Sequence, residues 1–169
     1  MSIDNNDLIA QLAKRVGILE AKDAAVHAMH RYWRVLDYKI FDDLKDCFTE
    51  EADCDWGTAG WQAIGRQKIY DFLHANESTS EIRLSHFGHN AEIAILDERT
   101  VSGIFKLEDW VTIAGRTIMR GFGQYNMIFT IGNDDVYRIS RLRLHYDYRE
   151  EYRVFVDGKM LASTPALDG

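Results

Sequence analysis

The feature that most constrains the fold of this chain is a change in the spacing of its apolar residues near Ser85. Before Ser85, apolar residues recur at intervals of about 3.6, the period of a helix that buries one side. After Ser85 they alternate with polar residues, as in a strand that buries one face. Helices that precede a run of long strands predict an α+β domain rather than alternating βαβ units.

Four helices are expected in the first half of the chain. Their predicted ranges are 7–20, 23–38, 41–49 and 66–75. The second is the clearest, because the apolar residues from Met29 to Ile40 form one continuous stripe. Gly57 and Gly60 predict a loop between the third helix and the fourth.

Four long strands are expected in the second half. Their predicted ranges are 84–96, 99–114, 117–131 and 136–148, with a candidate edge strand at 152–156. Short turns between them favour an antiparallel meander. Long strands twist and curl, so the sheet should form a cone whose interior pocket is closed by the N-terminal helices. No Pro-rich linker divides the chain, and we expect one domain over 1–158 and a tail over 159–169.

Composition limits the partners. A length of 169 residues fits one domain, and a net charge of −7 argues against nucleic acid or an anionic membrane as partner. The sequence lacks an apolar run of membrane-spanning length and a signal-peptide core, so a cytoplasmic location is expected. Four Trp, eight Tyr and eight Phe suit a pocket for a hydrophobic or aromatic small molecule. An aromatic-rich core or an oligomer interface would produce the same counts.

One carboxylate breaks the pattern of the second predicted strand. From Val101 to Ile113 every second residue is apolar or glycine, except Asp109. A buried carboxylate must be paired or must change its pKa, which makes Asp109 a candidate for proton chemistry. The alternative is a strand bulge that turns Asp109 to solvent.

Three further polar residues are candidates for the same chemistry. Tyr32 lies on the apolar stripe of the second helix and Asp37 at its C-terminal edge, where the helix dipole disfavours a carboxylate. His86 and His89 have opposite parity, so only one of them can face the interior of a regular strand. A core tyrosine, a solvated helix-end aspartate and a hydrogen-bonded surface histidine are the alternatives. We find no nucleotide-binding motif, and His27 and His30 have no further metal ligand in view.

Three segments carry a resemblance to a known family. YWRVLDYKIFDDL, LSHFGHNAEI and FKLEDW, with their spacing over roughly residues 10–150, resemble the SnoaL-like branch of the nuclear transport factor 2-like superfamily. Within that branch the pattern is most similar to the bile acid 7α-dehydratases, and more distantly to the scytalone dehydratases and lindane dehydrochlorinases.

The resemblance implies a lyase that needs neither cofactor nor metal and assembles as a homodimer or homotrimer. It implies that His86 acts as general base, that Asp37 orients it, that Tyr32 stabilises an oxyanion, and that Asp109 binds a substrate hydroxyl or serves as an acid. The expected reaction is a dehydratase-type elimination on a bulky cyclic or aromatic molecule such as a steroid, a polyketide or a lignin-derived aromatic.

The last long strand departs from the bile acid 7α-dehydratases, which carry an arginine late in this strand. The matching position is His145 or Tyr146. An apolar face that runs through Leu142, Leu144, Tyr146 and Tyr148 favours Tyr146 as the interior residue. The further candidates for substrate contact are Trp33, Trp56, Tyr125 and His89.

Other functions remain open from the sequence. The same histidine and aspartate could break a carbon–carbon bond in a phenolic diaryl compound and release formaldehyde, or could shift a double bond as an isomerase. A non-catalytic binding domain is the alternative of a different class, because fold does not imply function.

Overall fold

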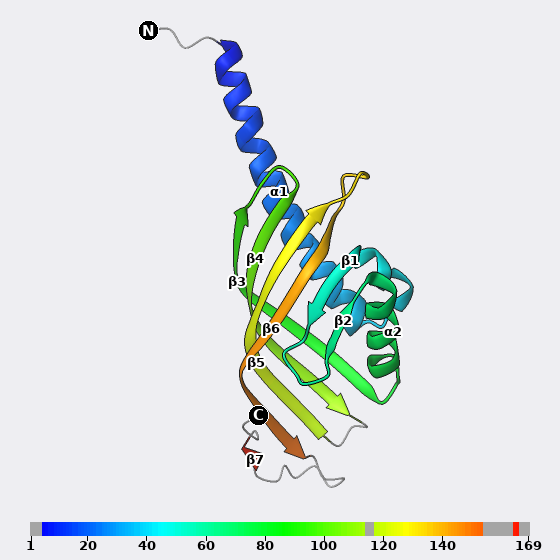
Figure 1. Ribbon diagram of the computed structural model, residues 1–169. Coiled ribbons are helices and arrows are strands. Elements are labelled where there is room, and N and C mark those ends of the chain that lie inside the picture. The colour runs from blue at the N-terminus through cyan, green and yellow to red at the C-terminus, as the bar shows by residue number, and fades with distance from the viewer. Residues whose placement is uncertain (1–4, 114–116, 154–163, 166–169) are drawn as a thin grey trace.

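The computed structural model describes residues 5–113, 117–153 and 164–165 (Figure 1). The helical elements are α1 (Asn5–Asp37), the 3₁₀ helix η1 (Phe41–Cys47) and α2 (Arg66–Glu77). The strands are β1 (Phe48–Asp55), β2 (Gln62–Ile64), β3 (Ile82–Ile95), β4 (Thr100–Ile113), β5 (Thr117–Ile131), β6 (Tyr137–Arg153) and β7 (Thr164–Pro165).

The strands form one mixed, curved sheet in the order β2-β1-β6-β5-β4-β3, and β7 pairs with β6. Strands β3 to β6 make the antiparallel meander that the alternation and the short turns predict. Strand β1 runs parallel to β6, which the sequence did not indicate. Within the described residues the edge strands β2 and β3 do not pair with each other, so the curved sheet is not closed. The expected fold class, helices over a curled sheet, is confirmed.

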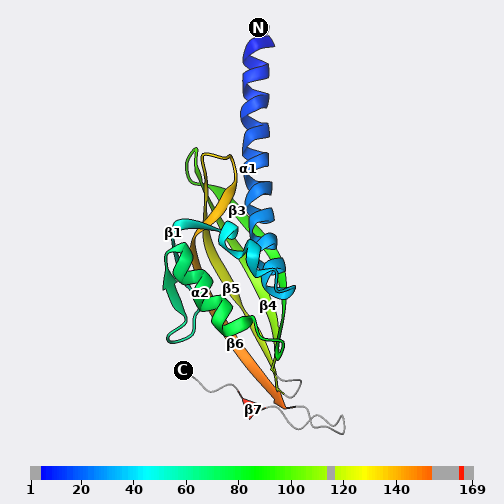
Figure 2. The same ribbon diagram turned by 90° about the vertical axis from the view of Figure 1, so that its right-hand side faces the viewer.

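Helix α1 corrects the expectation of two separate helices. It is continuous from Asn5 to Asp37, because the region around Ala21 contains neither proline nor glycine and is rich in good helix formers. Its first half extends beyond the sheet, and its second half lies against it (Figure 1 and Figure 2). Among the described residues, no helix is both long and apolar enough to cross a membrane.

Other segments also differ from the sequence expectation or extend beyond it. The predicted third helix is the 3₁₀ helix η1, and Phe48 begins strand β1 instead of continuing a helix. The predicted fourth helix is confirmed as α2 but extends to Glu77. The last long strand continues to Arg153, and residues 154–156 lie outside the described residues. Of the expected tail, Thr164–Pro165 pairs with β6 and the rest lies outside the described residues.

The core lies between the helices and one face of the sheet, here called the inner face. Trp33 of α1 packs against Phe105 of β4 and Tyr125 of β5, with ring centroids 6.1 and 6.0 Å apart. Phe129 and Leu142 continue this buried layer along β5 and β6. The second half of α1 is thereby held at a defined depth over the strands, and this fixes where its C-terminal end meets β3.

Candidate active site

The end of α1 delivers a carboxylate to the inner face. Asp37 is the last residue of the helix, and Lys39 follows in the left-handed conformation (φ 57°) that commonly terminates helices. The Lys39 ammonium donates hydrogen bonds to the carbonyl oxygens of Glu77 and Thr79, at 2.5 and 2.8 Å. These bonds tie the turn after α1 to the end of α2.

Asp37 and His86 form a hydrogen-bonded pair. Asp37 Oδ1 lies 2.6 Å from His86 Nδ1, and Asp37 Oδ2 accepts the backbone N–H of His86 at 3.1 Å. The side chains are largely buried, at 8% exposed for His86 and 20% for Asp37. Because a carboxylate only accepts, Nδ1 carries a proton, and in the neutral imidazole Nε2 then keeps its lone pair. The pair can therefore present a histidine base to a bound molecule.

An indole ring supports this histidine. Trp33 lies parallel to the His86 ring, with centroids 6.2 Å apart and an interplanar angle of 7°. Gly88 makes room for it, since a Cβ at that position would lie 2.1 Å from the indole. The alternation of His86 and Gly88 on the inner face of β3 thus allows the tryptophan to reach the histidine.

Asp109 faces the interior, as the parity argument predicts. It is 5% exposed and lies directly opposite His86 in the pairing of β3 with β4. The register is regular through this position on both sides, which excludes the alternative of a bulge at Asp109. Tyr146 donates its hydroxyl to Asp109 Oδ2 at 2.5 Å. Gly121 leaves the necessary space, because a Cβ there would lie 2.2 Å from Asp109 Oδ1.

A bulge in β6 places the guanidinium of Arg149 beside Tyr146, which the alternation of the sequence did not predict. Tyr146 pairs with Gly123 and Tyr148 with Phe122, so one extra residue lies between them. Tyr146 is the interior residue, as expected, but Tyr148 is 51% exposed and stacks on Phe122, which corrects the predicted apolar face. Arg149 then packs over the Tyr146 ring, with its guanidinium 3.7 Å from the centroid.

Two more tyrosine hydroxyls belong to the buried layer. Tyr32 OH accepts a hydrogen bond from Trp56 Nε1 at 2.8 Å, which leaves its own proton available to a ligand. Burial raises the pKa of Tyr32 and of Tyr125 well above the ordinary value, so both remain neutral donors at physiological pH. The structure thus places Tyr32, Trp56 and Tyr125 on the inner side together with the Asp37–His86 pair.

Glu77 is a functional candidate that the sequence analysis did not identify. It ends α2, and its carboxyl interacts electrostatically with His86, Asp37 and Asp109. Burial raises its pKa to about 7, against the opposing effect of His86 and Lys39. Among the described residues, the buried side-chain polar atoms without a hydrogen-bond partner are Glu77 Oε2 and Trp33 Nε1. Such atoms are rare in folded proteins, so each of these two requires an explanation.

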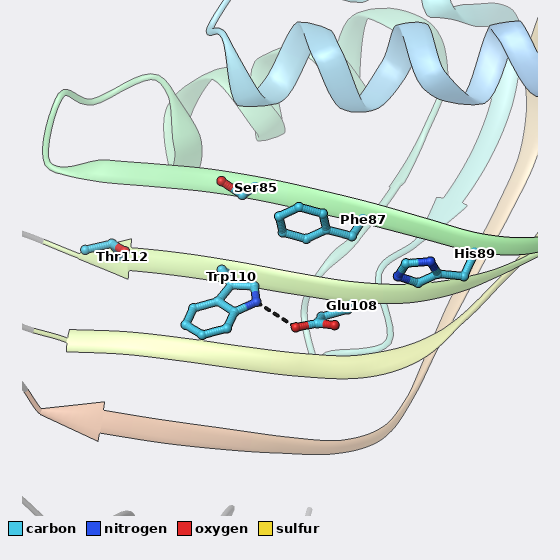
Figure 3. A pocket seen from close by; sticks show the side chains of 6 residues that line it. All are labelled: Ser85, Phe87, His89, Glu108, Trp110 and Thr112. Atoms are coloured by element: carbon cyan, nitrogen blue, oxygen red, sulfur yellow. Dashed lines mark hydrogen bonds between the residues drawn. The ribbon is translucent and has the colours of Figure 1, made fainter.

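His89 does not join this group. It is exposed on the outer face of the sheet, as its opposite parity to His86 requires. There it lines a hollow of about 500 Å³ between β3 and β4, in which Trp110 donates a hydrogen bond to Glu108 (Figure 3). The expectation that His89 contacts the same substrate as His86 is not supported by this placement.

Comparison with known proteins identifies the family. The SnoaL-like domain profile matches residues 17–143. A structure from Novosphingobium aromaticivorans, provisionally named a scytalone dehydratase, is similar with a TM-score of 0.72 and 18% identity over 92% of this chain and 99% of that one. Another from the same species, provisionally named an aromatic ring hydroxylase, has a TM-score of 0.70 and 16% identity over 89% and 96%.

A third similar structure is hexachlorocyclohexane dehydrochlorinase LinA-type3 from Novosphingobium barchaimii, with a TM-score of 0.69 and 15% identity over 92% of this chain and 99% of that one. At these identities the structures share the fold alone, and their names cover different reactions. The profile spans most of the chain, and the protein belongs to the SnoaL-like domain family.

Proposed function

We propose that this protein is a cofactor-independent lyase that eliminates water from a hydroxylated cyclic or aromatic small molecule. The observation that carries the proposal is the largely buried Asp37–His86 pair, whose geometry leaves Nε2 of the histidine as a base. The dehydratase and dehydrochlorinase names among the similar structures agree with an elimination, although they speak only for those proteins.

The proposed reaction assigns one role to each group. His86 removes a proton from a carbon next to an activating carbonyl, and Asp37 stabilises the imidazolium that forms. The neutral Tyr32 hydroxyl donates to the oxygen on which negative charge develops. Asp109, held by Tyr146, accepts a hydrogen bond from a substrate hydroxyl. The electron pair of the broken C–H bond forms the new double bond as the C–O bond breaks. The leaving hydroxyl takes up one proton from the site to depart as water, and the proton that His86 removed replaces it.

The aromatic residues support the proposed substrate class. Trp33, Trp56, Tyr125 and Tyr146 lie beside the polar groups and offer flat apolar surface to a ring system. Arg149, next to Tyr146, would suit a carbonyl, carboxylate or phenolate at one end of the molecule. A hydroxylated steroid, polyketide or lignin-derived aromatic has this combination of features.

The test is an ultraviolet assay without added cofactor and with EDTA. Wild type and His86→Ala are incubated with hydroxylated steroids, polyketide-like hydroxyketones and phenolic diarylpropane diols, and a new conjugated absorption is followed. His89→Ala is the matched control, because it removes a histidine from the same strand but from the outer face.

Turnover by wild type and His89→Ala, with a loss of about 10²–10⁴-fold in His86→Ala, would support the proposal. Formaldehyde release without loss of water would replace dehydration by carbon–carbon cleavage. No turnover of any compound, together with equal ligand binding by all three folded proteins, would overturn the lyase function in favour of a binding domain.

A further inference from the structure

Glu77 occupies an unusual position for a carboxyl group at the end of a helix. Such residues normally reach solvent, but Oε2 of Glu77 is buried and has no hydrogen-bond partner among the described residues. A buried polar atom without a hydrogen-bond partner costs free energy, so its presence in a folded protein requires an explanation. A ligand that completes the hydrogen bond would supply it.

The charged and polar groups around Glu77 identify that ligand's site. Its carboxyl interacts electrostatically with groups on five other elements and one turn: Tyr32 and Asp37 of α1, Lys39 in the turn after α1, His86 of β3, Asp109 of β4, Tyr125 of β5 and Tyr146 of β6. Residues that are distant in the sequence are thus close enough to this one carboxyl to interact with its charge. Apart from Lys39, they are the residues of the site to which the lyase reaction is assigned.

The nearby ammonium group of Lys39 forms no direct bond with the carboxyl of Glu77. Lys39 Nζ donates to the backbone oxygens of Glu77 and Thr79, not to the Glu77 side chain. Burial raises the pKa of Glu77 to about 7, so a large fraction of the group keeps its proton at neutral pH. A neutral carboxylic acid in this position is a hydrogen-bond donor and an acid of suitable strength.

The other acidic groups of the site are less suited to donate a proton. Both Asp37 oxygens accept hydrogen bonds from His86, and Asp109 accepts one from Tyr146. The tyrosine hydroxyls are weak acids, since burial raises the pKa of Tyr32 further. Glu77 combines an unoccupied oxygen with an intermediate acidity.

We propose that Glu77 is the general acid of this site and donates the proton that turns the leaving hydroxyl of the substrate into water. The inference rests on the proposed lyase function. In the complete step, the C–H proton passes to His86 Nε2 and its electron pair forms the double bond. The C–O bond breaks towards oxygen, which takes the Glu77 proton. Transfer of one proton from the His86 imidazolium to the Glu77 carboxylate then restores the site.

The experiment compares two leaving groups in wild type and Glu77→Gln. One compound is the hydroxylated substrate that the assay panel identifies, and the other carries chlorine in place of that hydroxyl. Chloride leaves as an anion and needs no proton, so it does not require the acid. Glu81→Gln, which changes an exposed carboxylate in the following turn, is the matched control.

Glu77→Gln should lower kcat about 10²-fold or more with the hydroxyl compound and leave elimination of chloride nearly unchanged. His86→Ala should lose both reactions. An equal loss with both leaving groups, or no loss with either, would overturn the role of Glu77 while the lyase function stands. If wild type eliminates neither leaving group, the lyase function fails and the acid role fails with it.

A measurement without substrate adds an independent check. Infrared difference spectra recorded across the pH range should contain a protonated carboxyl signal that is absent in Glu77→Gln and that titrates with a midpoint near 7. A carboxyl that is fully ionised at pH 6 would overturn the inference even if the protein is active.

Discussion

Asp37 holds His86 by accepting two hydrogen bonds at once, one from the ring Nδ1 at 2.6 Å and one from the backbone N–H at 3.1 Å. The first sets the tautomer of the imidazole, and the second fixes the position of the carboxylate against β3. Because Asp37 terminates α1 and His86 lies in mid-strand, the pair also joins the helix to the sheet. The predictions below concern this pair and the groups beside it.

Asp37→Asn should lower kcat/KM by about 10²–10⁴-fold, because an amide presents an N–H where the carboxylate accepts and so disfavours the active tautomer. Steady-state kinetics on the substrate from the panel would measure the change. Asp42→Asn, an exposed carboxylate of η1, is the control and should be fully active. Wild-type kinetics in a folded Asp37→Asn protein would contradict the role of the pair.

The pKa of Glu77 predicts a pH-dependent stability. Its value of about 7 in the folded protein exceeds the ordinary 4.5, so the native state holds the proton more tightly than the unfolded chain does. The contribution is fully present below pH 4.5 and is lost as the pH rises towards 7. Between pH 4.5 and 7 the unfolding free energy of wild type should therefore fall by about 2–3 kcal/mol relative to that of Glu77→Gln. Urea denaturation of both proteins over this pH range measures the change.

The control for this titration is Glu81→Gln. Its stability relative to wild type should not change over the same pH range, because Glu81 is exposed. A constant difference between Glu77→Gln and wild type from pH 4.5 to 7 would mean that Glu77 is ionised in the folded protein.

Gly121→Ala should destabilise the protein by about 1–3 kcal/mol and abolish the contact of Tyr146 with Asp109. The added Cβ would lie 2.2 Å from Asp109 Oδ1 and 2.4 Å from the Tyr146 ring. Gly17→Ala is the matched control, because a Cβ added at this position of α1 would have no neighbouring atom within 4 Å. This substitution should stabilise the helix by about 0.5–1 kcal/mol. Thermal unfolding distinguishes the two, and equal effects would contradict the crowding at Gly121.

Tyr146→Phe should cost about 1–3 kcal/mol at neutral pH, because it leaves the buried Asp109 without its hydroxyl donor. Tyr148→Phe makes the same chemical change two residues later, on the exposed side of the β6 bulge, and should be close to neutral. Chemical denaturation of both variants measures the difference. A larger loss in Tyr148→Phe would mean that the bulge lies elsewhere.

Much of the site was predictable because it depends on local periodicity. Strand parity alone placed Asp109 on the inner face and His86 and His89 on opposite faces, and the structure agrees. The helical stripe likewise placed Tyr32 among buried residues. Side-chain direction in a regular element follows from its period, which can be read from the sequence.

The remaining features depend on contacts between distant segments, which local periodicity does not encode. Pairing with β6 makes β1 a strand, although its sequence contains several charged residues. The bulge opposite Phe122 and Gly123 reverses the parity of β6, so that Tyr148 turns outward while Arg149 packs on Tyr146. Glu77 becomes a buried carboxyl because α2 and α1 end side by side near β3. The sequence therefore determined the fold class, the long strands of the meander and the faces of β3 and β4. Tertiary packing decided that β1 is a strand, the register of β6 and the surroundings of Glu77, since each of these requires other strands and helices to be in place.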